Sequence, residues 1–477
     1  MLLWQAGRFR TFAFRIYKFN YLKSLQLPTF LFIFLLNLHL SAQNKEIVKE
    51  DEPKLKDDFT EGHFHGHIRN FYMNTINRGE LKDYYTNATG GAVSFTTGNF
   101  KGFQFGVKGI FTYRTFGSDL GVRDAVTGKN AKWEYELYDV LNKGNFQDLN
   151  GLQGLFIRYR FGNSYISYGK LETEFSPLLN NSNGRMKPFA HRGAWSHLNI
   201  SENHQLNLGW LDGVSPRSTT GWFAMDEAIG LFYNGFQPNG EVAVYREIYS
   251  TTGIGILNYH FRKDNFQMNF YDFYLDKVMN TIWTELGYDL ADFNLGFQYV
   301  YQNPLSYSED LASVNRYVQP YENGQVLSSQ LSWKKTRFNV AFAYTHAFDS
   351  GRFLFPKELG RDRFFTSIPR SRLEGLGNTD VFTIKAEYHL PKPNLHFGLE
   401  MQQLDGPETG KLKFNKYNID ESFQVNSHLS YQAHGFLEGL SFDILWIFRE
   451  NQNHTDAQSI FNKSNFNQLN FVTNFNF

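Results

Sequence analysis

The chain has 477 residues and a formal net charge of zero, from 47 basic and 47 acidic side chains. It contains no cysteine, which excludes disulfides, thiolate metal sites and a cysteine nucleophile. Aromatic residues make up 18% of the chain although its mean hydropathy is −0.44. This combination is expected of a membrane barrel, in which apolar and polar residues alternate and aromatic girdles mark the membrane boundaries.

Residues 1–43 have the features of a secretory signal peptide. Five basic and no acidic residues precede an apolar run from Leu27 to Leu36, which is followed by small residues around Ala42. We expect cleavage near Ala42 or Gln43, which leaves a mature net charge of −5 and argues against a nucleic-acid partner. No later stretch approaches the ~18 apolar residues of a membrane-spanning helix.

The rest of the chain divides into a short lead-in and one long run of strands. Residues 44–61 are mixed in charge and poor in apolar groups, so we expect a flexible periplasmic lead-in. From residue 62 to 477 apolar and polar residues repeatedly alternate, for example over 103–114, 293–302 and 440–449. Alternation with period two predicts β-strands.

The last ten residues carry the same pattern to the chain end. Leu469, Phe471, Phe475 and Phe477 share one face of the expected strand, and mostly asparagine and glutamine lie on the other. A strand of ~9–11 residues with an apolar outward face suits a tilted bilayer crossing. The ending in phenylalanine resembles the closing strand of outer-membrane barrels, which the barrel-insertion machinery reads. An edge strand of a soluble sandwich is the alternative.

Connections between the expected strands alternate in length. Short turns such as 162–164 and 291–292 separate much longer stretches such as 117–151, 174–189 and 349–378. Short periplasmic turns and long extracellular loops are typical of outer-membrane barrels. The fold class is therefore all-β, a transmembrane antiparallel β-barrel of about 18 strands spanning 62–477, closed because lipid offers no hydrogen-bond partners to a free edge.

Few residues suggest catalysis or metal binding. His63, His65 and His67 lie on one face of the first strand, a spacing that could seat a metal, but polar lining of the lumen is the favoured explanation. No Gly-x-Ser-x-Gly elbow occurs. We therefore expect no enzyme, no cofactor and no metal site.

Two of the long stretches concentrate positive charge. The first contains Arg185 and Lys187 and is followed by Arg192. The second, residues 355–377, carries the charged residues Glu358, Arg361, Arg363, Arg370, Arg372 and Glu374. Taken alone, both stretches are also compatible with solvated loops whose charges pair with each other or with lipopolysaccharide.

The chain resembles the outer membrane porin D family of substrate-specific channels over essentially its whole mature length. Three stretches carry the resemblance, namely Arg69-Asn-Phe-Tyr72, then 176–193 with Ser176-Pro-Leu-Leu-Asn180 and Arg185-Met-Lys-Pro188, and the second basic stretch. The resemblance implies an 18-stranded barrel, an inward third loop with Arg185 at the constriction, and a ladder of basic side chains that guides small carboxylates, including amino acids. It places Arg361, Arg370 and Arg372 near the pore mouth.

One position departs from the family pattern. His191-Arg192 stand where the family usually has Phe-Glu before the glycine, so a base replaces an acid near the expected constriction and favours anionic solutes. From strand alternation alone we nominate four further lumen-facing bases, Lys108, Arg114, Arg158 and Arg160.

These observations predict an outer-membrane porin for passive, partly selective passage of small water-soluble solutes such as carboxylates, amino acids or peptides. Its other expected partners are outer-membrane lipid, lipopolysaccharide and the barrel-insertion machinery. The alternative is a barrel with a blocked lumen that binds or adheres through its loops. Conductance in a planar bilayer distinguishes the two.

Overall fold

The structure is a computed structural model that describes residues 61–477, except 143–147, 173–175, 183 and 455. The expected signal peptide and most of the expected lead-in lie outside the described residues. No helix in the described part of the chain is long and apolar enough to cross a membrane.

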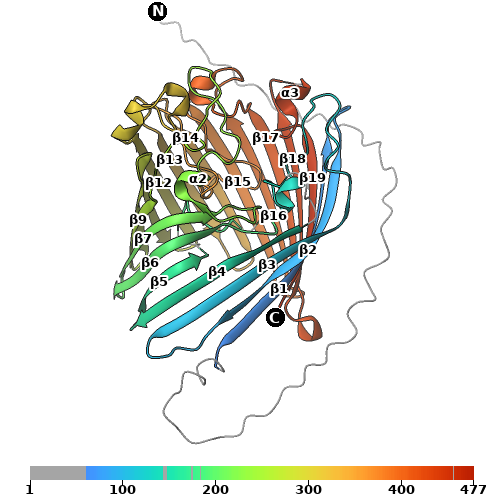
Figure 1. Ribbon diagram of the computed structural model, residues 1–477. Coiled ribbons are helices and arrows are strands. Elements are labelled where there is room, and N and C mark those ends of the chain that lie inside the picture. Colours follow the sequence, from blue (N-terminus) through green and yellow to red (C-terminus); the bar gives the residue numbers. More distant parts are fainter. Residues whose placement is uncertain (1–60, 143–147, 173–175, 183, 455) are drawn as a thin grey trace, which may run out of the picture. The chain divides into compact units, whose positions relative to one another are not determined.

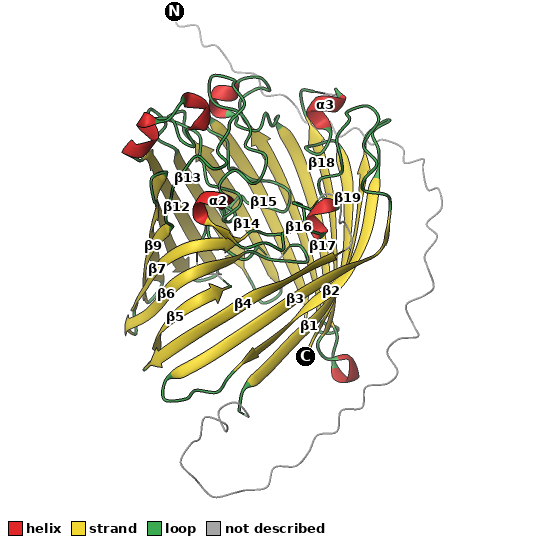
Figure 2. Cartoon of the chain, in the orientation of Figure 1, coloured by secondary structure: helices red, strands yellow, loops and turns green. Residues whose placement is uncertain are grey.

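Alternating sequence produces strands along the whole described chain (Figures 1 and 2). The first half contains β1 (His63–Asn77), β2 (Tyr84–Thr96), β3 (Phe103–Gly117), β4 (Asp148–Phe161), β5 (Ser164–Leu171), β6 (Ala190–Ser201), β7 (His204–Ser215), β8 (Phe223–Ala224), β9 (Ile254–Lys263) and β10 (Phe266–Leu275). The second half contains β11 (Met279–Leu290), β12 (Phe293–Pro304), β13 (Gln325–Lys334), β14 (Phe338–Ala347), β15 (Thr379–Leu390), β16 (Leu395–Asp405), β17 (Ser422–Gln432), β18 (Leu440–Asn451) and β19 (Phe466–Asn476). The helical segments are single turns: η1 (Tyr135–Leu137), α2 (Met225–Ala228), η2 (Ser306–Asp310), η3 (Ser313–Asn315), η4 (Leu412–Phe414), η5 (Gly435–Leu437) and α3 (Ala457–Ile460).

The strands form a closed antiparallel barrel. β1 pairs with β19 from His67 opposite Asn476 to Asn77 opposite Phe466, which joins the first strand to the last. The two-residue β8 pairs only with β7, while β9 also pairs with β7, so the ring contains 18 strands and β8 lies beside it. The predicted barrel of about 18 strands is confirmed.

Side chains alternate between the two faces of the barrel wall as expected. Leu469 and Phe475 of β19 are well exposed on the outer face, whereas Gln468 and Asn470, on either side of Leu469, are buried inside the barrel. The same arrangement exposes Phe103 and Phe105 at the start of β3. An apolar outer face is the surface that a barrel presents to lipid.

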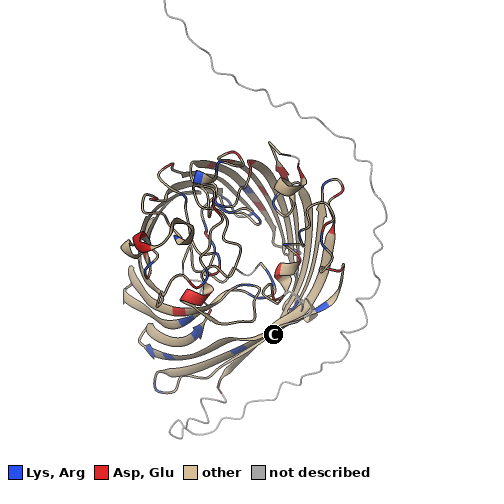
Figure 3. Ribbon diagram, turned by 45° about the horizontal axis from the view of Figure 1, so that its top comes forward, with Lys and Arg blue, Asp and Glu red and all other residues tan. Residues whose placement is uncertain are grey.

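The two barrel ends differ in their connections. The short turns predicted at 162–164 and 291–292, and six further short turns, lie at one end, where β1 begins and β19 ends. The longer connections lie at the opposite end, together with two short ones, 78–83 and 276–278. The view in Figure 3 shows several long connections running across the barrel interior.

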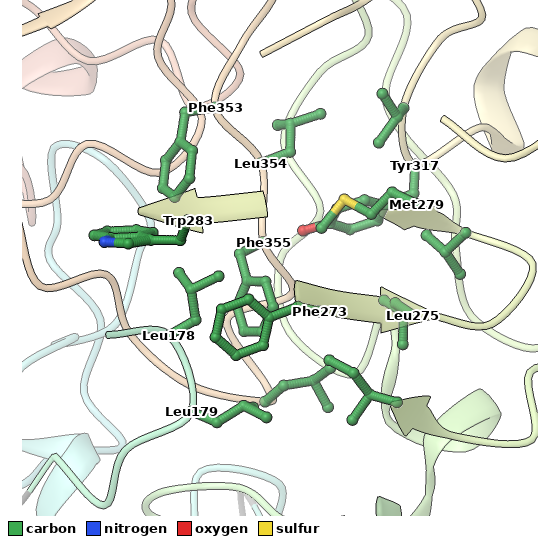
Figure 4. Packing of buried hydrophobic residues seen from close by; sticks show 14 of the residues in the cluster. Leu178, Leu179, Phe273, Leu275, Met279, Trp283, Tyr317, Phe353, Leu354 and Phe355 are labelled. Carbon is green, nitrogen blue, oxygen red and sulfur yellow. The ribbon is translucent and has the colours of Figure 1, made fainter. Parts of the chain in front are cut away.

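An apolar cluster lies inside the barrel and departs from the expected polar lining. Phe273 and Leu275 of β10 and Trp283 of β11 point inward and are almost fully buried. They pack against the loop residues Leu178 and Phe353, among others (Figure 4). The loops are therefore held inside by a hydrophobic core of their own on this side of the lumen.

Candidate constriction of the lumen

The loop between β5 and β6 (172–189, the β5–β6 loop) enters the barrel and contacts the inner wall at β1 and β4. Arg69 of β1 donates from Nη1 to the backbone carbonyl oxygen of Arg185 at 2.8 Å. Gln153 of β4 donates to the carbonyl oxygen of Pro188 at 3.3 Å, close to where the loop returns to the wall. The expected inward third loop is thus fixed at two points of the lumen surface.

The loop between β14 and β15 (348–378, the β14–β15 loop) also lies inside, tethered by side chains of the wall. Gln302 both donates to and accepts from the backbone of Leu354, at 2.7 and 2.8 Å. Further donors to its backbone carbonyl oxygens come from Gln298, Thr383, Lys385, Gln402, Gln424 and Arg449. The loop therefore follows the inner wall from β12 to β18.

These two loops meet inside the lumen. The backbone N–H of Arg361 donates to the carbonyl oxygen of Leu178 at 2.9 Å, and Asn180 donates to the carbonyl oxygen of Arg361 at 2.7 Å. Between them, a Cβ added at Gly360 would lie 2.0 Å from the Leu178 oxygen, so only glycine permits this approach. The junction makes one continuous constriction out of two loops.

The loop between β3 and β4 (118–147, the β3–β4 loop) contributes a carboxylate that lies among the cations of the constriction. Glu136 of η1 lies 2.6 Å from the Arg185 guanidinium and 3.1 Å from that of Arg217. Burial alone would raise the pKa of Glu136, but the charges of Arg185 and Arg217 outweigh it and hold the pKa well below its usual range. Glu136 therefore stays ionised and neutralises part of the positive charge of Arg185 and Arg217.

Two cations of the β14–β15 loop, Arg361 and Arg372, form no ion pair with an acid among the described residues. Among the described residues, the side chains of Arg361 and Arg372 make neither an ion pair nor a hydrogen bond, and both are partly exposed. Burial and then the charges of Arg372 and Arg217 lower the pKa of Arg361, against the opposite effect of the Asp362 carboxylate. Such groups retain their charge and can bind a carboxylate through two parallel hydrogen bonds.

Arg370 and Arg363 of the same loop differ in role. Arg370 is buried, donates to Gln468 at 2.7 Å and lies over the Trp133 ring, so it anchors the loop to β19. Arg363 is exposed. Both acids that we singled out in this loop hold other loops: Glu358 accepts from the backbone of Phe232, and Glu374 pairs with Lys416 at 3.7 Å.

The four bases nominated from alternation all lie on the lumen side of β3 and β4. Lys108 pairs with Glu172 at 2.7 Å, and Arg114 donates to the backbone of Ser118. Arg158 donates to Ser167 and stacks on Phe156 and Tyr165, 4.9 and 4.5 Å from the ring centres. Arg160 donates to Gln104 of β3. These contacts leave part of Arg158 and Arg160 available on the short-turn side of the constriction, whereas Arg114 lies near the long-loop end of β3.

Two residues expected at the constriction lie elsewhere. Arg192 pairs with Asp212 at 2.6 Å and stands opposite Lys170, on the same face as the outward Tyr168. A register shift where β6 meets β7 accompanies this orientation, which a family pattern cannot predict. The Lys187 ammonium is buried and donates to three backbone carbonyl oxygens, including those of Ser215 and Pro216, so it joins loops and cannot meet a solute.

No family model and no curated protein matches the chain. Several solved structures, in contrast, are similar to the chain. Acinetobacter baumannii OccAB4 has a TM-score of 0.67 at 13% identity, covering 87% of this chain and 98% of its own. Pseudomonas aeruginosa OccK3 (OpdO) has 0.63 at 15%, covering 89% and 97%, and a structure of Pseudomonas aeruginosa OpdK with vanillate has 0.62 at 13%, covering 88% and 99%. These neighbours are substrate-specific porins of the outer membrane porin D type.

The chain has the fold of these porins. Within this porin fold, our sequence analysis missed Glu136 and Arg217, which belong to loops with no distinctive pattern around those positions. Arg69 was part of a motif that carries the resemblance, but its contact with the β5–β6 loop could not be inferred from it. For metal binding, the described residues contain no group of three or more candidate ligands.

Proposed function

We propose that the protein is an outer-membrane porin that lets small anionic solutes, chiefly carboxylates, cross by passive diffusion. The observation that carries this proposal is the pair of guanidinium groups, Arg361 and Arg372, that have no ion-pair partner among the described residues of the constriction. The likeness to porin structures supports a channel rather than an enzyme. Outer-membrane lipid, lipopolysaccharide and the insertion machinery are the other partners of such a barrel.

As the solute crosses the constriction, side chains of the lumen replace its water molecules step by step. A carboxylate that enters a narrow passage loses part of its hydration shell, and guanidinium N–H groups supply hydrogen bonds in its place. Arg361 and Arg372 offer these bonds at the constriction, and Arg158 and Arg160 follow on the short-turn side. Each site must bind weakly enough to release the solute, so no energy source is required.

The test is conductance of the purified protein in a planar bilayer under a salt gradient. The proposal expects a reversal potential that indicates anion preference, and we expect Arg361→Gln and Arg372→Gln to reduce it. Arg78→Gln is a matched control, because Arg78 is exposed and pairs with Glu450 away from the constriction. A protein that inserts but carries no current would contradict the proposal and favour the blocked, adhesive barrel.

A further inference from the structure

The outer face of the barrel carries charged side chains on the neighbouring strands β5, β6, β7, β9 and β10. Lys170 shares the face of Tyr168, and Asp272 shares that of Tyr274, and both tyrosines are well exposed on the outside. Strand pairing sets Arg192 opposite Lys170 on this same face. Ionisable side chains on a lipid-facing surface are costly and therefore point to an interaction.

Only part of this charge is satisfied within the molecule. Arg192 pairs with Asp212. The Oδ1 atom of Asp272 is buried and has no hydrogen-bond partner in the described chain. The Lys170 ammonium lies 4.6 Å from the centre of the Trp222 ring, and no described carboxylate is within ion-pair distance of it. The face thus has an unpaired cation at one edge and an unpaired anion at the other.

These two charges lie at the same depth in the wall. Lys170 is six residues beyond Ser164, where β5 starts, and Asp272 is six residues beyond Phe266, where β10 starts. Both strands start at the short-turn end of the barrel. Equal numbers of residues along strands of similar tilt give equal heights above that end.

Between the two charges the surface is hollowed. An open groove of about 510 Å³ is lined by large apolar residues such as Leu208 and Trp210 and, between them, by the small residues Ala194, Ser196 and Gly255. Small residues allow close approach of neighbouring elements in a membrane. Leu208 lies midway across the face, since pairing places Ser196 and Ile166 on one side of it and Leu257 and Asp272 on the other.

We propose that this face binds a second copy of the same chain about a twofold axis parallel to the membrane normal. Copies inserted in the same direction can be related by that axis only if contacting residues lie at equal depth. A twofold contact is self-complementary, so Lys170 of each copy meets Asp272 of the other. Lipid tails offer Asp272 no partner, and an anionic headgroup would repel it, whereas a second copy supplies the missing cation.

Single cysteines test this arrangement, because the chain contains none of its own. Leu208→Cys places a thiol midway across the face, near the proposed axis, and oxidation of native membranes should give a disulfide-linked dimer. Phe342→Cys is the control, since Phe342 is equally outward on β14, far around the barrel. The dimer inference fails if Leu208→Cys remains monomeric or cross-links no better than Phe342→Cys. It also fails if the native assembly that contains Leu208→Cys has the mass of three chains.

Charge exchange in the Leu208→Cys background tests the pairing itself. Lys170→Asp and Asp272→Lys each place like charges together at both contacts, so most of the cross-linked dimer should be lost. The double variant restores opposite charges and should recover it, with heat-modifiable migration as the check of barrel assembly. If the double variant assembles and stays monomeric, the ion pair is refuted, and this comparison remains decisive even if either single variant fails to insert.

Discussion

The Arg185 guanidinium lies 2.6 Å from the Glu136 carboxylate, so an acid from one loop limits the charge that another loop brings into the lumen. Replacing Glu136 by glutamine should leave Arg185 and Arg217 charged but without their shared anion. We expect the anion-to-cation permeability ratio to rise roughly threefold or more, because a unit charge in a narrow passage changes the potential by at least about one kT. Reversal potentials measure this ratio, and Glu450→Gln, outside the lumen, should leave it unchanged.

The junction of the two loops should depend on the absence of a side chain at Gly360. In Gly360→Ala the new Cβ would lie 2.0 Å from the Leu178 oxygen, so the loops must separate at a cost of about 1–3 kcal/mol. Single-channel recordings should then show a larger and noisier conductance. Gly184→Ala is the control, since a Cβ there meets nothing within 4 Å. A normal trace for Gly360→Ala would show that the junction does not limit the pore.

Arg192 provides a negative test of the constriction. Because its side chain lies on the outer face beside Asp212, Arg192→Gln should leave the reversal potential unchanged. The Arg361→Gln variant is measured alongside for comparison. If both variants shift the reversal potential by a similar amount, the Arg192 side chain contributes to the pore after all.

The stability of the contact between two connections at the long-loop end, 406–421 and 452–465, should depend on pH. The His454 Nδ1 lies 2.6 Å from the Asp420 Oδ2, and this hydrogen bond raises the pKa of His454. A raised histidine pKa gives stabilisation that is complete below about pH 6.5 and is lost as the pH rises through the folded-state value. Local hydrogen exchange in 406–421 should therefore be faster at pH 9 than at pH 5.5, after correction for intrinsic rates. In His454→Gln this difference should disappear.

The outward face of the closing strand should be intolerant of charge. Phe475 is exposed on the outside near the short-turn end, so Phe475→Lys should destabilise the barrel by ~0–4 kcal/mol, depending on its depth in lipid. Unfolding by urea in lipid vesicles measures the change. Asn476→Lys, at the adjacent position, should cost less, and equal costs would place Phe475 outside the apolar belt.

Sequence predicted the wall far better than the interior. The barrel and its eight short turns follow from local alternation, which a strand's geometry enforces residue by residue. The inward Trp283 and Phe273 obey the same alternation but invert the expected polarity, because loops distant in sequence cover them. Glu136 and Arg217 meet Arg185 only through the folding of three separate loops, and no periodic pattern records such contacts.

The β14–β15 loop is held in part by neutral amides, such as those of Gln302, Gln402 and Gln424. Hydrogen bonds between uncharged groups are little affected by ions in solution, whereas bonds between full charges weaken as salt rises. The width of the passage should therefore stay constant from dilute to concentrated electrolyte, while its preference for anions fades. In such a channel, neutral amides help to set the geometry, whereas Arg361 and Arg372 set the selectivity.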